Sequence, residues 1–138
     1  MKNVLMVERI PSVQEYLNLR RAINWKIVDQ EASKKGLQGS LYCVCAELNR
    51  DIIGMARVIG DSGLYFYIQD VIVLPKYQKM GIGIMLMKKV MNYLETNITP
   101  YTVVGLMASK GKEPFYEKFG FIKRPSKRRG HGMFRIWE

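Results

Sequence analysis

The chain has 138 residues, 48% of them hydrophobic, and a net charge of +10 at pH 7, which is the composition of one globular domain with a hydrophobic core. It contains no run of about 18 apolar residues, and acidic and polar residues come too early in MKNVLMVERIPS for a secretory leader, so we expect a cytoplasmic protein without a membrane span. The positive charge suits a polyanionic partner, either a nucleic acid or a phosphate-bearing cofactor, and does not choose between them.

The first third of the chain predicts one strand and two helices. Residues 4–9 form the strand. Ser12 and Glu15 have the spacing of a capping box, which predicts a helix from Val13 to Ile23 with one apolar face. A second, shorter helix is expected over residues 29–35, closed by Gly36.

Three strands follow, at residues 41–48, 52–59 and 64–74, joined by the turns 49–51 and 61–63. The third is long for a strand, so a β-bulge is expected in it. Cys43 and Cys45 are two residues apart in the first of them, where a disulfide would be strained, so we interpret them as buried small side chains. With one histidine, they leave no zinc site to predict.

The next stretch, residues 67–95, organises the chain. A strand ends at Leu74-Pro75, a turn contains Gly81 and Gly83, and an amphipathic helix follows. The first N–H groups of a helix have no internal partner, and the helix dipole is positive there, so this turn suits a phosphate or pyrophosphate. It is neither a dinucleotide-binding fingerprint nor a P-loop, because Leu86 replaces the third glycine and no Gly-Lys-Ser/Thr follows.

The last third predicts a buried strand over residues 99–107 and a short helix over residues 112–119, capped by Gly120. A final pair of strands is expected at 121–124 and 132–137, on either side of a basic loop. The whole order, β-α-α-β-β-β-α-β-α-β-β, predicts a mixed sheet with helices on both faces.

Two segments resemble the signatures of a known family. Gln78-Lys79-Met80-Gly81-Ile82-Gly83 is similar to the Gln/Arg-x-x-Gly-x-Gly/Ala signature for acetyl-CoA of the GNAT superfamily of N-acetyltransferases. Residues 113–121, EPFYEKFGF, resemble the second GNAT signature, a short helix that carries a tyrosine and ends in Gly-Phe. With the order of elements, the resemblance covers residues 4–137.

The resemblance implies an α/β fold, classed as α+β in some schemes, in a single domain over residues 1–138. Its central sheet is mixed and mostly antiparallel, with about six to seven strands and about four flanking helices. The fourth and fifth strands splay apart, and acetyl-CoA binds where they separate.

The family's pattern then implies which residues contact this cosubstrate. Backbone groups of residues 71–73 pair with the pantetheine amides, as an added strand pairs with an open sheet edge, and the N–H groups of residues 79–84 hold the pyrophosphate. The implied cofactor-binding residues are Val71, Ile72, Val73, Gln78, Lys79, Met80, Gly81, Ile82, Gly83, Ile84, Ser109, Lys112 and Tyr116. The family often has an asparagine where this chain has Ser109, so Lys110 and Lys112 are alternative contacts for coenzyme A there. Met80 stands where a basic residue is common and carries no charge to add.

The resemblance also places Tyr116 near the thioester sulfur. A phenol with a pKa of about 10 is protonated at pH 7 and can donate to a leaving thiolate; the alternative is a tyrosine that only packs the short helix. Asp70 is the candidate base, with Tyr67 beside it, and Gln69 cannot titrate. Asp70 is equally readable as a buried hydrogen-bonding group, so water-mediated deprotonation is the default expectation.

The substrate-binding candidates are Trp25, Tyr67 and Gln69. Trp25 falls where relatives place walls of the acceptor site, and with Tyr65 or Tyr67 it could form an aromatic rim. The alternative is that Trp25 packs the first two helices on the sheet. The basic residues of 123–129 suit either a solvated face or a dock for the 3′-phosphate of coenzyme A or for an acidic partner.

These observations predict an acyltransferase that moves the acetyl group of acetyl-CoA directly to a primary amine, since neither signature contains a cysteine relay. The expected acceptor is a small molecule, and a strongly cationic one would be repelled by the net charge of +10 unless a local acidic pocket exists. Acetylation of protein lysines or N-termini, and a non-catalytic module that binds coenzyme A or RNA, remain alternatives. Nucleic acid is disfavoured because no nucleic-acid motif is found; a homodimer stays open.

Overall fold

The structure is a computed structural model, and it describes residues 3–138. The chain divides into two compact units, Met1–Leu106 and Met107–Glu138. In chain order the elements are β1 (Val4–Val7), α1 (Val13–Ala22), α2 (Gln30–Gln38), β2 (Tyr42–Leu48), β3 (Asp51–Gly60), β4 (Tyr65–Val73), the 3₁₀ helix η1 (Pro75–Tyr77), α3 (Ile82–Glu95), β5 (Val103–Leu106) and α4 (Glu113–Glu117).

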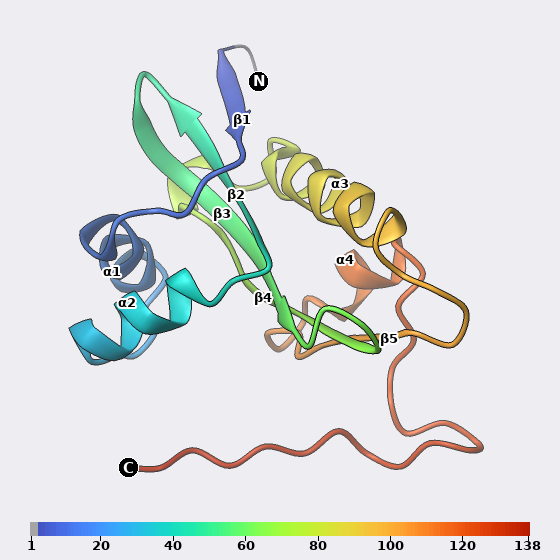
Figure 1. Cartoon of the computed structure of the whole chain (residues 1–138). Helices are drawn as coiled ribbons and strands as arrows, with labels where there is room; N and C mark the ends of the chain where they lie inside the picture. Colours follow the sequence, from blue (N-terminus) through green and yellow to red (C-terminus); the bar gives the residue numbers. More distant parts are fainter. Residues whose placement is uncertain (1–2) are drawn as a thin grey trace. The chain divides into compact units, whose positions relative to one another are not determined.

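The first unit contains one sheet, with its strands in sequence order from β1 to β5 (Figure 1). β1 to β4 pair antiparallel, and β5 lies parallel to β4. The parallel pair is possible because α3 carries the chain across between β4 and β5. The predicted mixed, mostly antiparallel sheet is therefore confirmed.

The two faces of the sheet are covered by different helices (Figure 1). α1 and α2 cover one face, where Leu17, Leu19 and Leu37 pack with Cys43 and Cys45 in a buried cluster. α3 packs against β2, β3 and β4. Both cysteines are free and buried, as predicted, because β2 is covered on both faces.

Gly54 allows β3 to approach both its neighbour strand and the helix α3. A Cβ at this position would lie 2.7 Å from the carbonyl oxygen of Ile72 and 3.3 Å from the side chain of Leu86. Real Cβ atoms do not come that close to a backbone oxygen, so a larger residue would push the strands or α3 apart.

The predicted capping box is present at the start of α1, where Glu15 N donates to Ser12 Oγ and Ser12 N donates to the Glu15 carboxylate. The predicted end of α2 at Gly36 is wrong. The helix continues to Gln38 and Gly39 caps it, because Leu37, 2% exposed, belongs to the core under α2. Glycine at position 36 costs helix stability without ending the helix.

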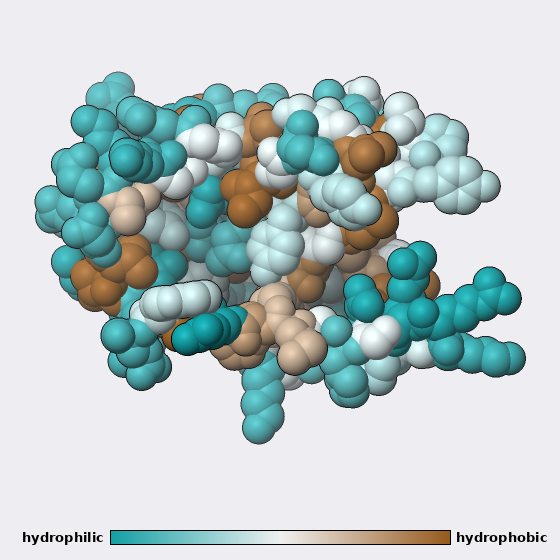
Figure 2. All heavy atoms as spheres, turned by 60° about the horizontal axis from the view of Figure 1, so that its bottom comes forward, coloured by the Kyte–Doolittle hydropathy of each residue, from teal (hydrophilic) through white to brown (hydrophobic). Residues whose placement is uncertain are grey.

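The number of predicted strands is also wrong: residues 3–138 form five strands, not six to seven. Residues 121–124 and 132–137 are not strands. Beyond residue 122, backbone hydrogen bonds are local, between Ser126 and Arg129. The large apolar side chains of this stretch are exposed: Ile122, Met133, Phe134, Ile136 and Trp137. Figure 2, which brings the lower side of Figure 1 forward, shows hydrophobic and hydrophilic residues mixed on that surface. Without a buried face, apolar alternation alone does not make a strand.

Candidate active site

The conformation of the turn between β4 and α3 leaves backbone N–H groups without an acceptor in the described part of the chain. Lys79 and Gly81 both have positive φ, 63° and 84°, and Gly81 is the N-cap of α3 with no side-chain cap. The Gln78 side chain donates to the Val73 carbonyl at 2.9 Å, which ties the turn to the end of β4. Glycine suits the left-handed conformation of position 81, because most other residues, Asn and Asp excepted, are strained there.

The backbone N–H groups of residues 79–84 have no acceptor among residues 3–138. The hydrogen bonds on either side of them, from Gln78 N to Pro75 and from Met85 N to Gly81, are present. No acidic side chain lies in the first turn of α3, and a Cβ at Gly81 would meet nothing within 4 Å. Consecutive free donors at the positive end of a helix, with open space above them, fit an anion such as a phosphate.

The edge of β4 beside this turn is open. β5 pairs with β4 only from Tyr65 to Ile68, so residues 69–73 extend beyond the parallel pairing. This agrees with the predicted separation of the fourth and fifth strands. An open edge of this kind can pair with an extended ligand through main-chain hydrogen bonds.

A β-bulge interrupts β4 within this open stretch, as predicted. Met55 lies opposite Ile72 and Arg57 lies opposite Gln69, so two residues of β4 oppose one residue of β3. Asp70, one of the two, has a φ of 56°. Aspartate tolerates this left-handed conformation better than most residues do. The bulge places the Asp70 side chain on the face covered by α1.

Asp70 is buried and fully engaged by neighbouring donors. Arg57 Nε donates to Oδ2 at 2.6 Å and Tyr16 Oη donates to the same oxygen at 3.0 Å. The Gln69 amide donates to Oδ1 at 3.2 Å, and Arg20 Nη1 lies 3.8 Å from Oδ1. This arrangement suits a structural carboxylate, because accepting a proton would weaken its ion pairs. A role for Asp70 as base stays a prediction.

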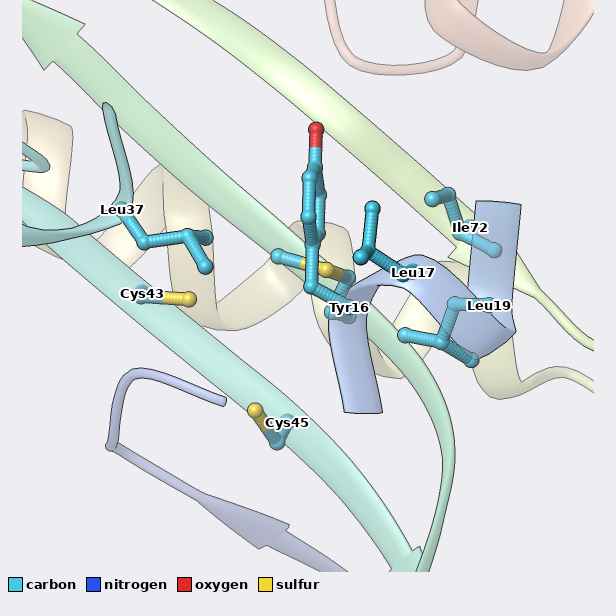
Figure 3. Close-up of a cluster of buried hydrophobic side chains, with 8 residues drawn as sticks. Tyr16, Leu17, Leu19, Leu37, Cys43, Cys45 and Ile72 are labelled. Carbon is cyan, nitrogen blue, oxygen red and sulfur yellow. The ribbon is translucent and has the colours of Figure 1, made fainter. Parts of the chain in front are cut away.

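Tyr16 links α1 to this carboxylate. Its ring extends past Leu17 and over the sheet (Figure 3), and its hydroxyl receives a hydrogen bond from Arg20 Nη1 at 3.1 Å. Burial, and after it the charge of Asp70, raises the pKa of Tyr16. The phenol therefore remains a donor to Asp70 at neutral pH.

Trp25 packs against the core cluster under α1, and the guanidinium of Arg20 lies 5.4 Å from its ring centroid. Gln69 and Tyr67 come from β4 and are half-buried. Trp25 lies beside Arg20, and Gln69 donates to Asp70, so both side chains belong to the network around Asp70. Whether these side chains contact an acceptor remains a prediction.

The second unit contains Tyr116 on the short helix α4. Its ring packs edge-on against Phe115 and Phe121, with centroids 5.1 and 6.5 Å apart. Burial raises the pKa of Tyr116, so the phenol is protonated at neutral pH. Within the same unit, Ser109 accepts a backbone hydrogen bond from Lys112 at 2.9 Å, and the Lys112 side chain is exposed.

Sequence reasoning did not find three residues of the Asp70 network: Tyr16, Arg20 and Arg57. A signal existed for each. Tyr16 and Arg20 are four residues apart on the apolar face of a predicted helix, and Arg57 interrupts an apolar strand. A charged residue among buried positions normally has a buried partner, and Asp70 was the available carboxylate.

Among residues 3–138, no helix is both long and apolar enough to cross a membrane. In the same part of the chain, no three His, Cys, Asp or Glu side chains gather in a group that could hold a metal ion.

Comparison with known proteins decides the family. The sequence profile of the acetyltransferase (GNAT) domain matches residues 12–135, which is most of the chain. The chain belongs to the GNAT acetyltransferase family. GNAT proteins are acyltransferases that use acetyl-CoA as cosubstrate, so the predicted family and enzyme class are confirmed.

Solved structures support the same assignment. The GNAT chain is 33% identical to a protein of unknown function from methicillin-resistant Staphylococcus aureus, described as a probable acetyltransferase; the match covers 97% of this chain and 99% of that one, with a TM-score of 0.89. A GNAT-family acetyltransferase from Streptococcus pneumoniae is 27% identical over 96% of this chain and 97% of its own, with a TM-score of 0.80.

A curated relative matches over a shorter region. The uncharacterized N-acetyltransferase ycf52 of Pyropia yezoensis is 30% identical over 79 residues, which is 57% of this chain and 44% of the relative. The match therefore spans less than half of that protein's length.

Proposed function

We propose that this GNAT protein transfers the acetyl group of acetyl-CoA to a primary amine of a small molecule, with residues 1–138 acting as one domain. The observation that carries the proposal is the run of free backbone N–H groups from Lys79 to Ile84 at the start of α3. Acetyl-CoA presents a pyrophosphate, which is the chemistry that such donors bind.

The first unit offers donors for two parts of this cosubstrate. The turn from Gln78 to Ile84 would hold the pyrophosphate through backbone N–H groups, with Lys79 adding a positive charge. The open edge of residues 71–73 would pair with the pantetheine amides. Main-chain binding of this kind depends on backbone geometry, so Met80 is compatible with it.

Tyr116 would act as the general acid. Attack of an amine on a thioester expels a thiolate, which a protonated donor stabilises. The raised pKa of Tyr116, which burial causes, keeps the phenol protonated at neutral pH. Acetyl-CoA supplies the activated acyl group, and the phenol supplies the proton that the sulfur takes.

The acceptor must lose a proton before it attacks. A primary amine with a pKa of about 10.4 is mostly protonated at pH 7, with roughly one neutral molecule in two thousand. Because Asp70 is engaged by Arg57 and Tyr16, water would carry the proton away, with Asp70 holding the surrounding network in place.

We favour direct transfer with both substrates bound together. Cys43 and Cys45 are buried in the core of the first unit, and the remaining 136 residues contain no cysteine. A covalent acetyl relay on sulfur would need an accessible thiolate. Cysteine therefore provides no relay here.

The test is thiol release from acetyl-CoA, measured with arylalkylamines, amino acids, polyamines, amino sugars and lysine peptides. Turnover with a small amine supports the proposal. Turnover with lysine peptides alone would replace the small molecule by a protein acceptor. Binding of coenzyme A with no turnover would indicate a non-catalytic module, and salt-sensitive RNA binding without any affinity for coenzyme A would overturn the proposal.

A further inference from the structure

The network around Asp70 contains more positive than negative charge. The guanidinium groups of Arg57 and Arg20 lie 2.6 and 3.8 Å from this one carboxylate. Among residues 3–138, no other carboxylate lies within the 4.0 Å of an ion pair with either arginine. All three side chains are largely buried, at 12% exposed for Arg57, 14% for Arg20 and 0% for Asp70.

A second cluster in the same unit shows the opposite balance. Arg9 is paired with two carboxylates, those of Glu15 and Glu47, at 2.9 and 2.7 Å. Buried charges in proteins are normally compensated. The excess of one guanidinium at Asp70 is therefore a property of this site and not of the fold's ion pairs in general.

Among the described residues, Arg20 donates fewer side-chain hydrogen bonds than Arg57 and lies farther from Asp70. Arg57 donates to Asp70, to the Gly36 carbonyl and to Ser40 Oγ, which fixes it between β3 and the end of α2. Arg20 donates to the Lys26 carbonyl and to the neutral hydroxyl of Tyr16, and its distance to Asp70 is the longer one. Its positive charge is thus the one left for a ligand.

The guanidinium of Arg20 lies beside two aromatic rings. Its guanidinium lies 5.4 Å from the ring of Trp25 and 5.6 Å from that of Tyr16. The network also includes Gln69 and the bulge residue Asp70 of β4, beside the open edge that we assign to pantetheine. A planar guanidinium held over aromatic rings binds a carboxylate in a fixed orientation.

We infer that the acceptor of this enzyme is an amine that also carries a carboxylate, and that Arg20 binds this carboxylate. The inference rests on the proposed function, because it names the acceptor class of the same reaction. Amino acids and related ω-amino acids have this chemistry. A polyamine has only positive charges, so the same guanidinium repels it.

The experiment compares matched acceptors that differ only in the carboxylate: phenylalanine with phenethylamine, and tryptophan with tryptamine. Thiol release from acetyl-CoA gives kcat/KM for each. We expect the carboxylated member of a pair to be favoured by about tenfold or more, the size of a lost hydrogen bond to a charged group. In Arg20→Gln this preference should disappear through a higher KM for the amino acid.

Arg21→Gln is the matched control. It removes the same charge from the same helix, but the Arg21 side chain is exposed and, within residues 3–138, donates only to Asn18. The preference should survive in this variant, and Arg20→Lys should restore part of it. Circular dichroism of each variant checks that the fold is intact, and titration of phenylalanine into the protein with coenzyme A gives a readout independent of turnover.

The outcomes separate the inference from the proposed function. Turnover of plain amines with no preference for carboxylates, or a preference that survives Arg20→Gln, overturns the inference and leaves the proposed function standing. No turnover of either member of a pair, and no binding of phenylalanine, overturns both. A carboxylate preference lost in Arg20→Gln and kept in Arg21→Gln supports both.

Discussion

Two titratable side chains, Tyr116 and Asp70, have different surroundings, and we propose a chemical role for the first and a structural role for the second. Tyr116 is a half-buried phenol with aromatic neighbours and a raised pKa, and Asp70 is a fully buried carboxylate between two arginines. The first can give a proton at neutral pH. The second holds a bulge, a helix and a strand together.

Replacing Tyr116 by Phe should lower kcat/KM for acetyl transfer by about a hundredfold, the usual size of a general-acid contribution. The affinity for coenzyme A should change by less than about twofold, because only the hydroxyl is lost. Thiol release and calorimetric titration of coenzyme A measure the two quantities. Tyr101→Phe is the control, since Tyr101 is 99% exposed. Unchanged turnover in Tyr116→Phe would remove this residue from the acid role.

Replacing Asp70 by Asn should lower the free energy of unfolding by about 3 kcal/mol, because it leaves Arg57 and Arg20 without a buried counter-charge. Asparagine adopts the left-handed conformation of this position, so the backbone is not strained and the charge effect is isolated. Urea unfolding measures it. Asp51→Asn, at an exposed position, should change stability by less than about 0.5 kcal/mol. Equal stabilities of the two variants would contradict a structural role for Asp70.

At the scale of the elements, the start of α1 is held by hydrogen bonds among Arg9, Ser12 and Glu15. Arg9 donates to both carboxylate oxygens of Glu15, and Glu15 also caps Ser12. Mainly through the hydrogen bond from Arg9, the pKa of Glu15 falls from 4.5 to about 2. A carboxylate with a lowered pKa stabilises the fold above its unfolded pKa and loses this contribution as pH falls toward the folded value.

Wild type should therefore be more stable than Glu15→Gln at pH 7, by about 1 kcal/mol at this partly exposed pair. The difference should shrink as pH falls below 4.5 and be nearly gone near pH 2. Urea unfolding of both proteins across this range measures it. Glu95→Gln, on an exposed residue, serves as control. A difference that stays constant between pH 7 and pH 3 would contradict the assignment.

Local signals predicted most of these elements, and the errors have physical reasons. The capping box of Ser12 and the glycine at α3 act within a few residues of chain, so their effects are visible in sequence. The end of α2 depended on the burial of Leu37, a tertiary contact. Residues 121–124 and 132–137 have the composition of strands, but a strand also needs a partner edge, which sequence does not reveal.

The geometry of the candidate site was predictable to a similar degree. Gln78, Gly81 and Gly83 lie in one contiguous motif, and the role that we propose for this motif follows from its position at the start of a helix. Arg20 and Arg57 come from distant segments and meet only at Asp70, so spacing along the chain could not pair them. The bulge itself was expected from the length of β4; the direction in which it turns Asp70 was not.

For the whole molecule, the net charge of +10 fits a cosubstrate with several phosphates better than a polyamine acceptor. Coulombic attraction of this kind is screened by salt. The affinity for coenzyme A should therefore fall as ionic strength rises, as measured by titration at two salt concentrations. An affinity independent of salt would indicate that the phosphates are not held by charge or by the helix dipole.

The central claim is that the start of α3 binds the phosphates of acetyl-CoA, and titration of coenzyme A into Gly81→Asp and Gly81→Asn tests it most directly. Both residues accept the positive φ of position 81 and can cap the helix, so the two variants differ in one negative charge beside the N–H groups of residues 79–84. The account predicts binding within a few-fold of wild type for Gly81→Asn and at least about tenfold weaker for Gly81→Asp. Equal affinities of the two variants, or no binding by wild type, would contradict it.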